Sequence, residues 1–348
     1  MTSINALRLD FHSGLMLCDE ARYWNPDWMI FYTPEKIRRI VSEHIVKKTK
    51  TVMFMGQTGT SSIGDEWIME VARAVTREYE KRVESDCADT ECLPRLNEIA
   101  HLAFQTIIKI KQTHIDDFLI GKFGFTSADL IRGYTMDREK GKITITNQDQ
   151  IKAALNYMTF NQNPDEVKGI FGNSQILAGY NPVDGFKMYY MTERWPVCEE
   201  VHEIFIAQGS GRDTCDLNYS RFADTRLLIE RRTEKSIPRH KGLFALLQGL
   251  YQALNQTAGI GGYPKIIYIN GHEKNPAKWT LEISDHRSKL ALEIVGAAIE
   301  NLLDKTKAED LLEDLIFKGT DFFKINTRFK SEAVNRKKLE RFLRKYPL

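Results

Sequence analysis

Short apolar runs separated by turn-forming residues dominate the first part of the chain and predict β-strands. Residues 2–10 and 14–18 form two such runs around the turn at residues 11–14, and residues 51–55 form a third that ends at Gly56. Runs of this length, bounded by turn residues, are typical of buried strands. Further strands are predicted at residues 142–146, 174–180, 186–192, 203–207, 265–270 and 279–283.

Two long segments between these runs carry apolar residues at helical spacing. One covers residues 65–80 and the other residues 95–118, with a loop at residues 86–94 between them. Two consecutive helices between sheet segments argue against a parallel sheet of alternating strands and helices, and favour an α+β fold with helices outside packed sheets. Residues 121–172 are less regular and are interpreted as an insertion or elaboration. Further helices are predicted at residues 149–159 and 241–256, and over most of the chain from residue 286 onward.

The composition is that of an ordinary soluble globular protein. The chain has 348 residues, of which 42% are hydrophobic and 28% charged, and its formal net charge is +2. That charge is too balanced for nucleic-acid binding over the whole chain. No apolar run reaches the roughly 18–20 residues that a membrane helix needs, and no secretory signal precedes the first strand. We therefore expect neither nucleic acid nor membrane as a partner.

The cysteines and the glycine-rich loop predict no cofactor and no metal site. None of the five cysteines forms a CxxC pair of the kind found in zinc sites. An odd, scattered set is not a disulfide framework either, so a reduced, cytoplasmic compartment fits best. The loop at residues 56–64 lacks the Gly-Lys-Ser/Thr ending of a phosphate-binding loop. The cysteines are Cys18, Cys87, Cys92, Cys198 and Cys215.

Thr2, directly after the initiator Met1, is the first candidate catalytic residue. Removal of Met1 would leave Thr2 with a free α-amine, whose pKa of roughly 7.7–8.0 leaves a good share uncharged near neutral pH. That amine can accept the proton of the Thr2 hydroxyl, which is a known way to activate a nucleophile. Many proteins also begin with Met-Thr or Met-Ser, so this feature gains weight only from its surroundings.

Several short motifs follow Thr2 in a characteristic order. They are residues 13–22 with Asp19, residues 35–40 with Lys36, residues 51–56 followed by Asp65, residues 177–181 with Asp184-Gly185 and Met188-Tyr189 after them, Gly209-Ser210-Gly211, and Gly261-Gly262 before a strand. In this order and rough spacing the motifs resemble the proteasome family of N-terminal-nucleophile hydrolases, and the chain looks like a divergent β-like member. The resemblance implies a hydrolase domain at residues 2–285, with residues 121–172 as an insertion, and a helical C-terminal extension at residues 286–348.

The resemblance implies a four-layer αββα sandwich in which Thr2 is the nucleophile. Asp19 and Lys36 would lie beside it, where the ammonium lowers the pKa of the amine by disfavouring a second positive charge. The carboxylate offsets the cost of burying that ammonium. The amide of Gly56 would donate to the developing oxyanion, where one such donor is typically worth about 2.7–4 kcal/mol. Ser210 would hold the Thr2 amine and hydroxyl through hydrogen bonds.

Each of these residues also has an ordinary structural interpretation. Asp19 could end a strand or belong to a turn, and residues 209–211 could be a plain turn. Lys36 could be an exposed residue at the start of a helix, because the preceding Thr-Pro-Glu has the form of an N-cap followed by proline. The basic stretch at residues 335–345 is interpreted as a solvated helix face rather than a nucleic-acid site.

The chain departs from the family pattern in its late turn, at residues 255–262. The family carries an Asp and a Ser near the nucleophile there, whereas this chain has no Asp and has Ile260 in place of the Ser. The loop after Gly56 is also longer than usual, which would reshape the specificity pocket. Met1 alone precedes Thr2, so we expect methionine aminopeptidase, rather than autolysis, to expose the nucleophile.

The favoured hypothesis is a threonine-type peptidase or amidohydrolase that forms an acyl-enzyme on Thr2. Transfer of the acyl group to an amine, and hence peptide ligation, is a close variant. The alternative is a catalytically silent scaffold or ring subunit, which the altered late turn favours. The resemblance implies a peptide or protein substrate, a homo-oligomer and an ATP-dependent unfoldase as partners. The apolar stripe of the helix at residues 95–118 is the best candidate contact for self-association.

Overall fold

The fold contains both helices and antiparallel sheets, as the order of apolar patterns predicts. Most strands and the long helices lie where the sequence places them, within a few residues at their ends. The predicted loop at residues 86–94 lies outside the described part of the chain. The computed structural model describes residues 2–24, 29–32, 36–59, 61–85, 95–137, 139–159, 172–192, 198–224, 236–257 and 260–344.

The first sheet has five strands and holds the N-terminal strand next to its edge. Its antiparallel order is β12-β1-β2-β13-β14. Ile4 on β1 lies opposite Cys18 on one neighbour and Gln208 on the other. This register brings the start of the chain, the end of β2 and the end of β12 to one end of the sheet. The strands are β1 (Ser3–Arg8), β2 (Ser13–Cys18), β12 (Phe205–Gly209), β13 (Lys265–Asn270) and β14 (Thr280–Ile283).

The second sheet also has five antiparallel strands, in the order β11-β10-β9-β6-β5. A tight turn joins β9 to β10, where the Asn181 side-chain oxygen accepts hydrogen bonds from the amides of Val183 and Asp184. Such a side-chain bond stabilises the turn that the Asn-Pro-Val-Asp-Gly sequence predicts. The strands are β5 (Ile37–Arg39), β6 (Val52–Thr58), β9 (Ser174–Asn181), β10 (Gly185–Thr192) and β11 (Cys198–Glu200).

The two sheets pack face to face around a shared apolar cluster that contains Ile4 and Met16 from the first sheet and Phe54 and Phe186 from the second. The approach is close enough to require glycine on β2, because a Cβ atom on Gly14 would lie 2.1 Å from the Phe186 ring. Burial of large apolar side chains between the sheets supplies the main stabilisation of this arrangement.

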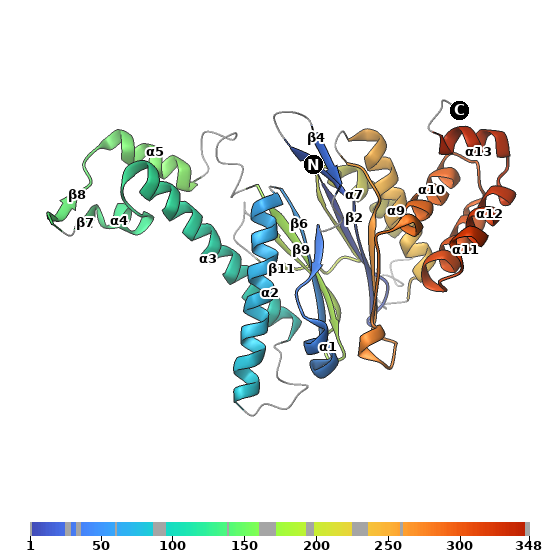
Figure 1. The fold of residues 1–348 in the computed structure, drawn as a ribbon, viewed down its shortest axis with the longest axis horizontal. Helices are drawn as coiled ribbons and strands as arrows, with labels where there is room; N and C mark the ends of the chain where they lie inside the picture. The colour runs from blue at the N-terminus through green and yellow to red at the C-terminus, as the bar shows by residue number, and fades with distance from the viewer. Residues whose placement is uncertain are drawn as a thin grey trace.

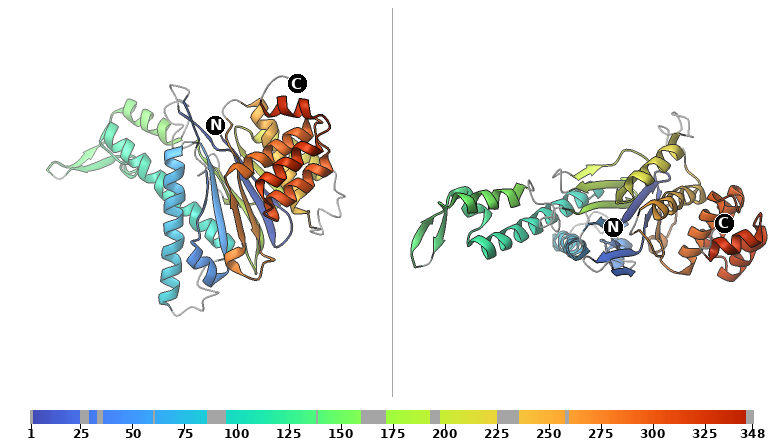
Figure 2. Two further views of the ribbon diagram at one scale, coloured as in Figure 1. Left: turned by 45° about the vertical axis from the view of Figure 1, so that its right-hand side comes forward. Right: turned by 90° about the horizontal axis from the view of Figure 1, so that it is seen from above.

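Helices lie on the outer side of each sheet (Figures 1 and 2). On the second sheet these are α2 (Ser61–Glu84) and the first half of α3 (Leu96–Phe123). On the first sheet they are α7 (Arg212–Asp224), α9 (Arg239–Gln256) and α10 (His286–Ile299), which share a second apolar cluster with Leu7 and Leu15. Three further helices continue this layer towards the C-terminus, namely α11 (Lys305–Leu312), α12 (Phe322–Glu332) and α13 (Arg336–Leu343).

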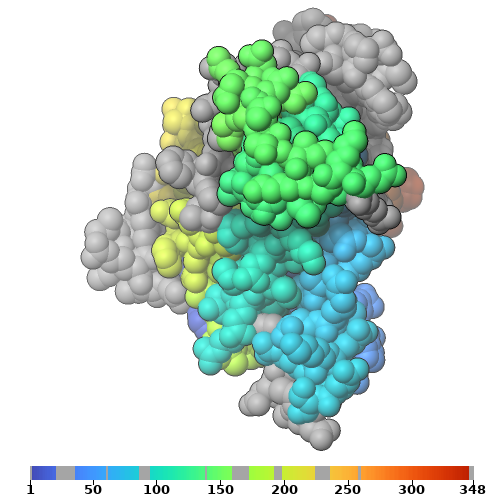
Figure 3. Space-filling model, turned by 90° about the vertical axis from the view of Figure 1, so that its left-hand side faces the viewer, coloured from blue at the N-terminus to red at the C-terminus, as the bar shows by residue number. Residues whose placement is uncertain are grey.

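An arm projects from the body beyond the middle of α3 (Figures 1 and 2). The space-filling view shows it standing above α2 on this face of the molecule (Figure 3). The arm has a small apolar cluster of its own, formed by Ile115, Leu119, Phe125 and Ala154. Besides the second half of α3, its elements are α4 (Ser127–Arg132), β7 (Tyr134–Asp137), β8 (Gly141–Thr144) and α5 (Gln148–Thr159).

Several elements differ from the sequence-based expectation. The apolar stripe predicted as a contact for self-association is covered within the chain, since Ile99 and Ile107 of α3 are buried in the cluster beneath the helix. No helix starts at Lys36, which instead leads directly into strand β5. Helix α7 follows the Gly-Ser-Gly turn without having been predicted. Also unpredicted are α1 (Glu43–Thr49) and the hairpin of β3 (Ala21–Trp24) and β4 (Met29–Tyr32).

None of the helices within the described ranges is long and apolar enough to cross a membrane.

Candidate active site

A buried ion pair joins the two sheets at the end where the chain begins. The Lys36 ammonium lies 2.8 Å from the Asp19 carboxylate, and the two side chains are only 2% and 1% exposed. Asp19 follows the last residue of β2 in the first sheet, and Lys36 precedes β5 in the second. Lys36 is therefore not the exposed residue that one interpretation expected. Asp19 does stand at the end of a strand, and its buried charge is stable there because it is paired.

The Asp19 carboxylate also accepts two backbone hydrogen bonds. The Ser3 amide donates to the same oxygen that binds Lys36, at 2.8 Å, and the Gly261 amide donates to the other oxygen at 3.2 Å. Burial raises the pKa of Asp19 above its ordinary value, while the Lys36 ammonium and these two amides oppose that rise. The donors thus keep a carboxylate in place at a position where water does not reach it.

Thr2 is held by the turn after β12. Its backbone N–H donates to the Ser210 hydroxyl oxygen at 3.2 Å, and the Ser210 hydroxyl donates to the Thr2 carbonyl oxygen at 3.4 Å. Only glycine fits beside this contact: Gly209 has φ of +97°, and a Cβ atom there would lie 2.0 Å from the Thr2 carbonyl oxygen. Thr2 is 8% exposed, so it is shielded from bulk water.

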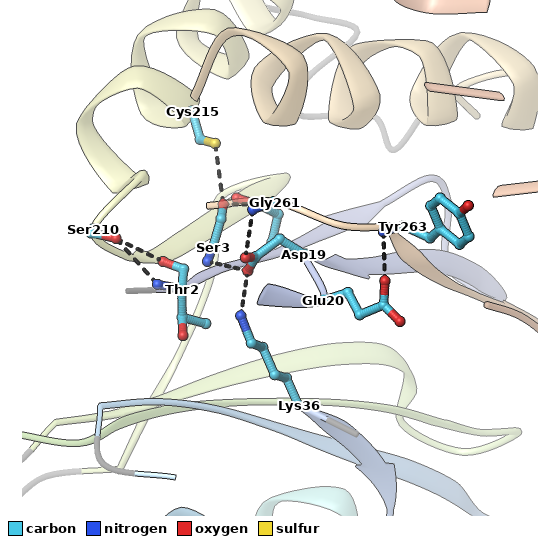
Figure 4. Close-up of polar contacts among 10 residues, drawn as sticks. Thr2, Ser3, Asp19, Glu20, Lys36, Ser210, Cys215, Gly261 and Tyr263 are labelled. Atoms are coloured by element: carbon cyan, nitrogen blue, oxygen red, sulfur yellow. Dashed lines mark hydrogen bonds and ion pairs between the residues drawn. The ribbon is translucent and has the colours of Figure 1, made fainter. Parts of the chain in front are cut away.

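Figure 4 shows how these residues lie relative to one another. Lys36 rises from the second sheet and points towards Asp19, and Thr2 lies to one side of the pair with Ser210 beyond it. The Ser3 amide connects the two parts, because Ser3 follows Thr2 in the chain and binds the oxygen that Lys36 contacts. The structure therefore brings four of the predicted site residues to one place.

Gly56 is the fifth predicted residue, and the structure gives it a packing function. It lies inside β6, paired with Ile37 on one side and with Ile176 on the other. A Cβ atom on Gly56 would lie 2.9 Å from Ile4 and 3.2 Å from Ile37. The next amide, of Gln57, donates to the Lys36 carbonyl oxygen. Because successive residues of a strand alternate in direction, the Gly56 amide faces β9, and its function as an oxyanion donor stays a prediction.

The late turn contacts the site through its backbone. The sequence analysis considered only the side chains of this turn and did not predict the contact. Gly261 donates to Asp19, and its carbonyl oxygen accepts from the Glu20 amide at 3.0 Å. The Glu20 carboxylate in turn accepts from the Tyr263 amide at 2.8 Å. The side chain of Ile260 packs against Gly211, and a Cβ atom added to Gly211 would lie 2.7 Å from that side chain. The paired glycines before β13 were the available signal for this backbone contact.

The buried thiols near the site are poor nucleophiles. Burial raises the pKa of Cys18 to about 12 and that of Cys215 to about 11, and only the thiolate form attacks electrophiles. Cys215 lies behind β1, where its sulfur is 3.6 Å from the Ser3 hydroxyl. Within the ranges that the structure describes, no group of three or more His, Cys, Asp or Glu residues could hold a metal ion.

Comparisons with known proteins identify a fold but no family. No family model matches the sequence, and no curated protein matches it. Among solved structures, the chain is similar to Anbu (ancestral beta-subunit) from Yersinia bercovieri, with a TM-score of 0.52, 9% identity, and coverage of 86% of this chain and 94% of that one. An Anbu mutant from Hyphomicrobium sp. strain MC1 has a TM-score of 0.47 at 10% identity, over 86% of this chain and 96% of that one.

These findings correct the assignment that the sequence motifs suggested. The interpretation of the chain as a divergent proteasome β-like member was wrong, because the solved structure that the chain resembles at a TM-score of 0.52 is an Anbu chain. What the first neighbour shows is a shared fold. The functional argument therefore depends on the geometry of the site itself.

Proposed function

We propose that the chain is an N-terminal-threonine amidohydrolase acting on peptides. After removal of Met1, the free amine of Thr2 takes the proton of its own hydroxyl while the hydroxyl oxygen attacks the substrate carbonyl carbon. The tetrahedral intermediate then expels the amine product, which leaves with that proton, and an ester remains on Thr2. Water attacks this ester and releases the acid, whereas attack by a second amine would ligate peptides.

The observation that carries this proposal is the buried ion pair of Lys36 and Asp19 beside the first strand. An ammonium near the Thr2 amine disfavours a second positive charge, so it favours the neutral amine that acts as the base. Asp19 holds the ammonium at this position, and Ser210 holds the nitrogen of Thr2. Buried charges of this kind are costly, and perturbed groups of this kind concentrate at functional sites.

The predicted architecture and assembly belong to the same proposal. The two packed sheets with helices on both outer sides support a four-layer αββα sandwich. The separate apolar cluster of the arm supports an insertion within residues 121–172, and the helices from residue 286 support a C-terminal extension to a hydrolase domain at residues 2–285. Self-association of the chain and an ATP-dependent unfoldase remain proposals that depend on the hydrolase function.

Intact-mass analysis and peptide hydrolysis test the proposal together. We expect the mass to lack one methionine, and fluorogenic peptide amides to be cleaved. Thr2→Ala keeps a small second residue, so Met1 is still removed, but it lacks the hydroxyl and is expected to be inactive with an unchanged fold. Thr2→Ser is expected to retain activity. Cleavage by Thr2→Ala at the wild-type rate would rule out Thr2 as the nucleophile.

A catalytically silent scaffold is the second candidate, and one observation favours it. Ile260 occupies the late turn and is only 7% exposed, so an apolar side chain fills a position close to Gly211 and the Ser210 turn. A hydroxyl there could have supported the Thr2 amine. Retention of Met1 on the purified chain, with no hydrolysis of any peptide amide, would favour this second function.

A further inference from the structure

A groove lies at the open edge where the two sheets end side by side. Strand β12 is one edge of the first sheet, and β11 is one edge of the second. Together with the start of α7 they enclose a cavity of about 370 Å³. No described strand pairs with the outer edge of β12. A free strand edge in a groove is the arrangement to which extended peptides add as a further strand.

The walls of this groove carry excess negative charge. Glu199 and Glu203 are exposed on the wall, and neither has an ion-pair partner among the residues that the structure describes. The other acidic residues of the wall are paired: Glu200 binds Lys187 at 2.6 Å, and Asp216 binds Arg212 at 3.1 Å. The unpaired carboxylates therefore favour a ligand that carries positive charge.

Gln208 places a side-chain amide in the groove. The residue is 5% exposed and lines the groove, and its side chain makes no hydrogen bond within the described ranges. Its amide is therefore available to bond to a ligand. Gln208 lies opposite Ile4 in the sheet and two residues before Ser210, which binds Thr2. The groove therefore ends next to the candidate active site.

We infer that this groove binds an extended, lysine- or arginine-bearing segment of the peptide substrate as an added strand on β12. The inference rests on the proposed hydrolase function and names its substrate class. The backbone of the segment pairs with the free edge of β12, and the Gln208 amide bonds to that backbone. Side chains alternate along a strand, so every second residue faces the carboxylates of Glu199 and Glu203.

Binding can be measured without catalysis by using the Thr2→Ala variant. The probe is a fluorescently labelled peptide of alternating valine and lysine, and the comparison peptide alternates valine and glutamate. We expect fluorescence anisotropy to show salt-sensitive binding of the first peptide only. Adding Glu199→Gln and Glu203→Gln to the Thr2→Ala background should weaken that binding at least about tenfold. The matched control is Glu139→Gln, an exposed glutamate on the hairpin of the arm, which should leave binding unchanged.

Two results would overturn the inference. One is equal binding of the lysine and glutamate peptides, and the other is unchanged binding after both glutamates of the groove are replaced. Failure of the hydrolase function gives a different pattern: the lysine peptide still binds and the groove variants still weaken it, but the wild-type chain cleaves nothing. Cleavage by the wild type with no effect of the groove variants on binding or on KM would retain the hydrolase and reject the groove.

Discussion

The backbone amide of Gly261 donates a hydrogen bond to the Asp19 carboxylate at 3.2 Å, although the two residues are 242 positions apart. This contact connects the late turn to the charged pair through the main chain, without the use of a side chain of the turn. A main-chain donor survives substitution of the turn's side chains, provided that the backbone keeps its path. The apolar side chain of Ile260 therefore does not interrupt this contact, and the carboxylate accepts hydrogen bonds from Lys36 and from both amides.

Removing either partner of the buried ion pair should destabilise the protein strongly. Lys36→Met leaves Asp19 as an unpaired buried charge, so we expect a loss of about 3–5 kcal/mol in the free energy of unfolding. The double variant Lys36→Met with Asp19→Asn has no such charge and should recover part of that loss, while peptide hydrolysis stays absent. Urea unfolding of the three proteins measures this. A loss below about 1 kcal/mol in Lys36→Met would contradict a buried, essential pair.

The protonation of Asp19 should be visible in the pH dependence of stability. Its pKa in the folded chain lies above the ordinary value of 3.8, so between the two values the folded state binds more protons than the unfolded state. The stabilisation by this proton is complete below the unfolded value, and it is lost as the pH rises through the folded value. We therefore expect the difference in the free energy of unfolding between the wild type and Asp19→Asn to fall as the pH rises from 3.8 to the pKa of the folded chain.

In acid, activity should be lost first as the Thr2 amine, which is the proposed base, becomes protonated, and protonation of Asp19 should add to that loss. Because neutral Asp19 no longer stabilises the Lys36 ammonium, hydrolysis should decline at a pH higher than 3.8. A profile of kcat/KM against pH measures this limb. An acid limb centred below that value would show that Asp19 is not the group responsible.

Glycine at position 209 should be indispensable, in contrast to glycine at an open helical position. Gly209→Ala places a Cβ atom 2.0 Å from the Thr2 carbonyl oxygen at a φ of +97°. We therefore expect the free energy of unfolding to fall by about 1–3 kcal/mol and activity to be lost. Gly121→Ala is the matched control, because nothing lies within 4 Å of that Cβ atom in α3. It should stabilise the chain by about 0.5–1 kcal/mol. Thermal unfolding of both variants separates the two effects.

Native alkylation should spare the thiols next to the site. Burial holds the pKa of Cys18 at about 12 and that of Cys215 at about 11, so both should remain unmodified by iodoacetamide at mildly alkaline pH. Peptide mapping of native and urea-unfolded protein provides the comparison. Rapid modification of Cys18 in the native chain, with parallel loss of hydrolysis, would point to a cysteine nucleophile instead.

Local sequence patterns were sufficient to predict most elements. The apolar run at residues 51–55 forms the first part of β6, and the segments with helical spacing at residues 65–80 and 95–118 form most of α2 and α3. Helix α7 escaped prediction because its sequence, Arg212–Asp224, is largely polar. Its few buried residues, such as Cys215 and Tyr219, face the first sheet from a helix whose exposed side dominates the pattern.

The candidate site could be predicted only in its side chains. Thr2, Asp19, Lys36 and Ser210 carry chemistry that is visible in the sequence, and the structure places them together. The amide donors to Asp19 are invisible to such reasoning, because every residue except proline has an amide and only the folded path decides which one reaches a carboxylate. The direction of the Gly56 amide depends in the same way on strand pairing.

The two charges of the ion pair come from different sheets, so the site can form only after the two sheets have packed together. A chain whose sheets have formed but have not yet packed has Asp19 and Lys36 apart, each in water, and an ordinary threonine at its start. In the proposed mechanism the amine becomes an efficient base only when the sheets close. A nascent or misfolded copy would then be harmless to the peptides around it, because the reactive group is switched on by the same contact that finishes the core.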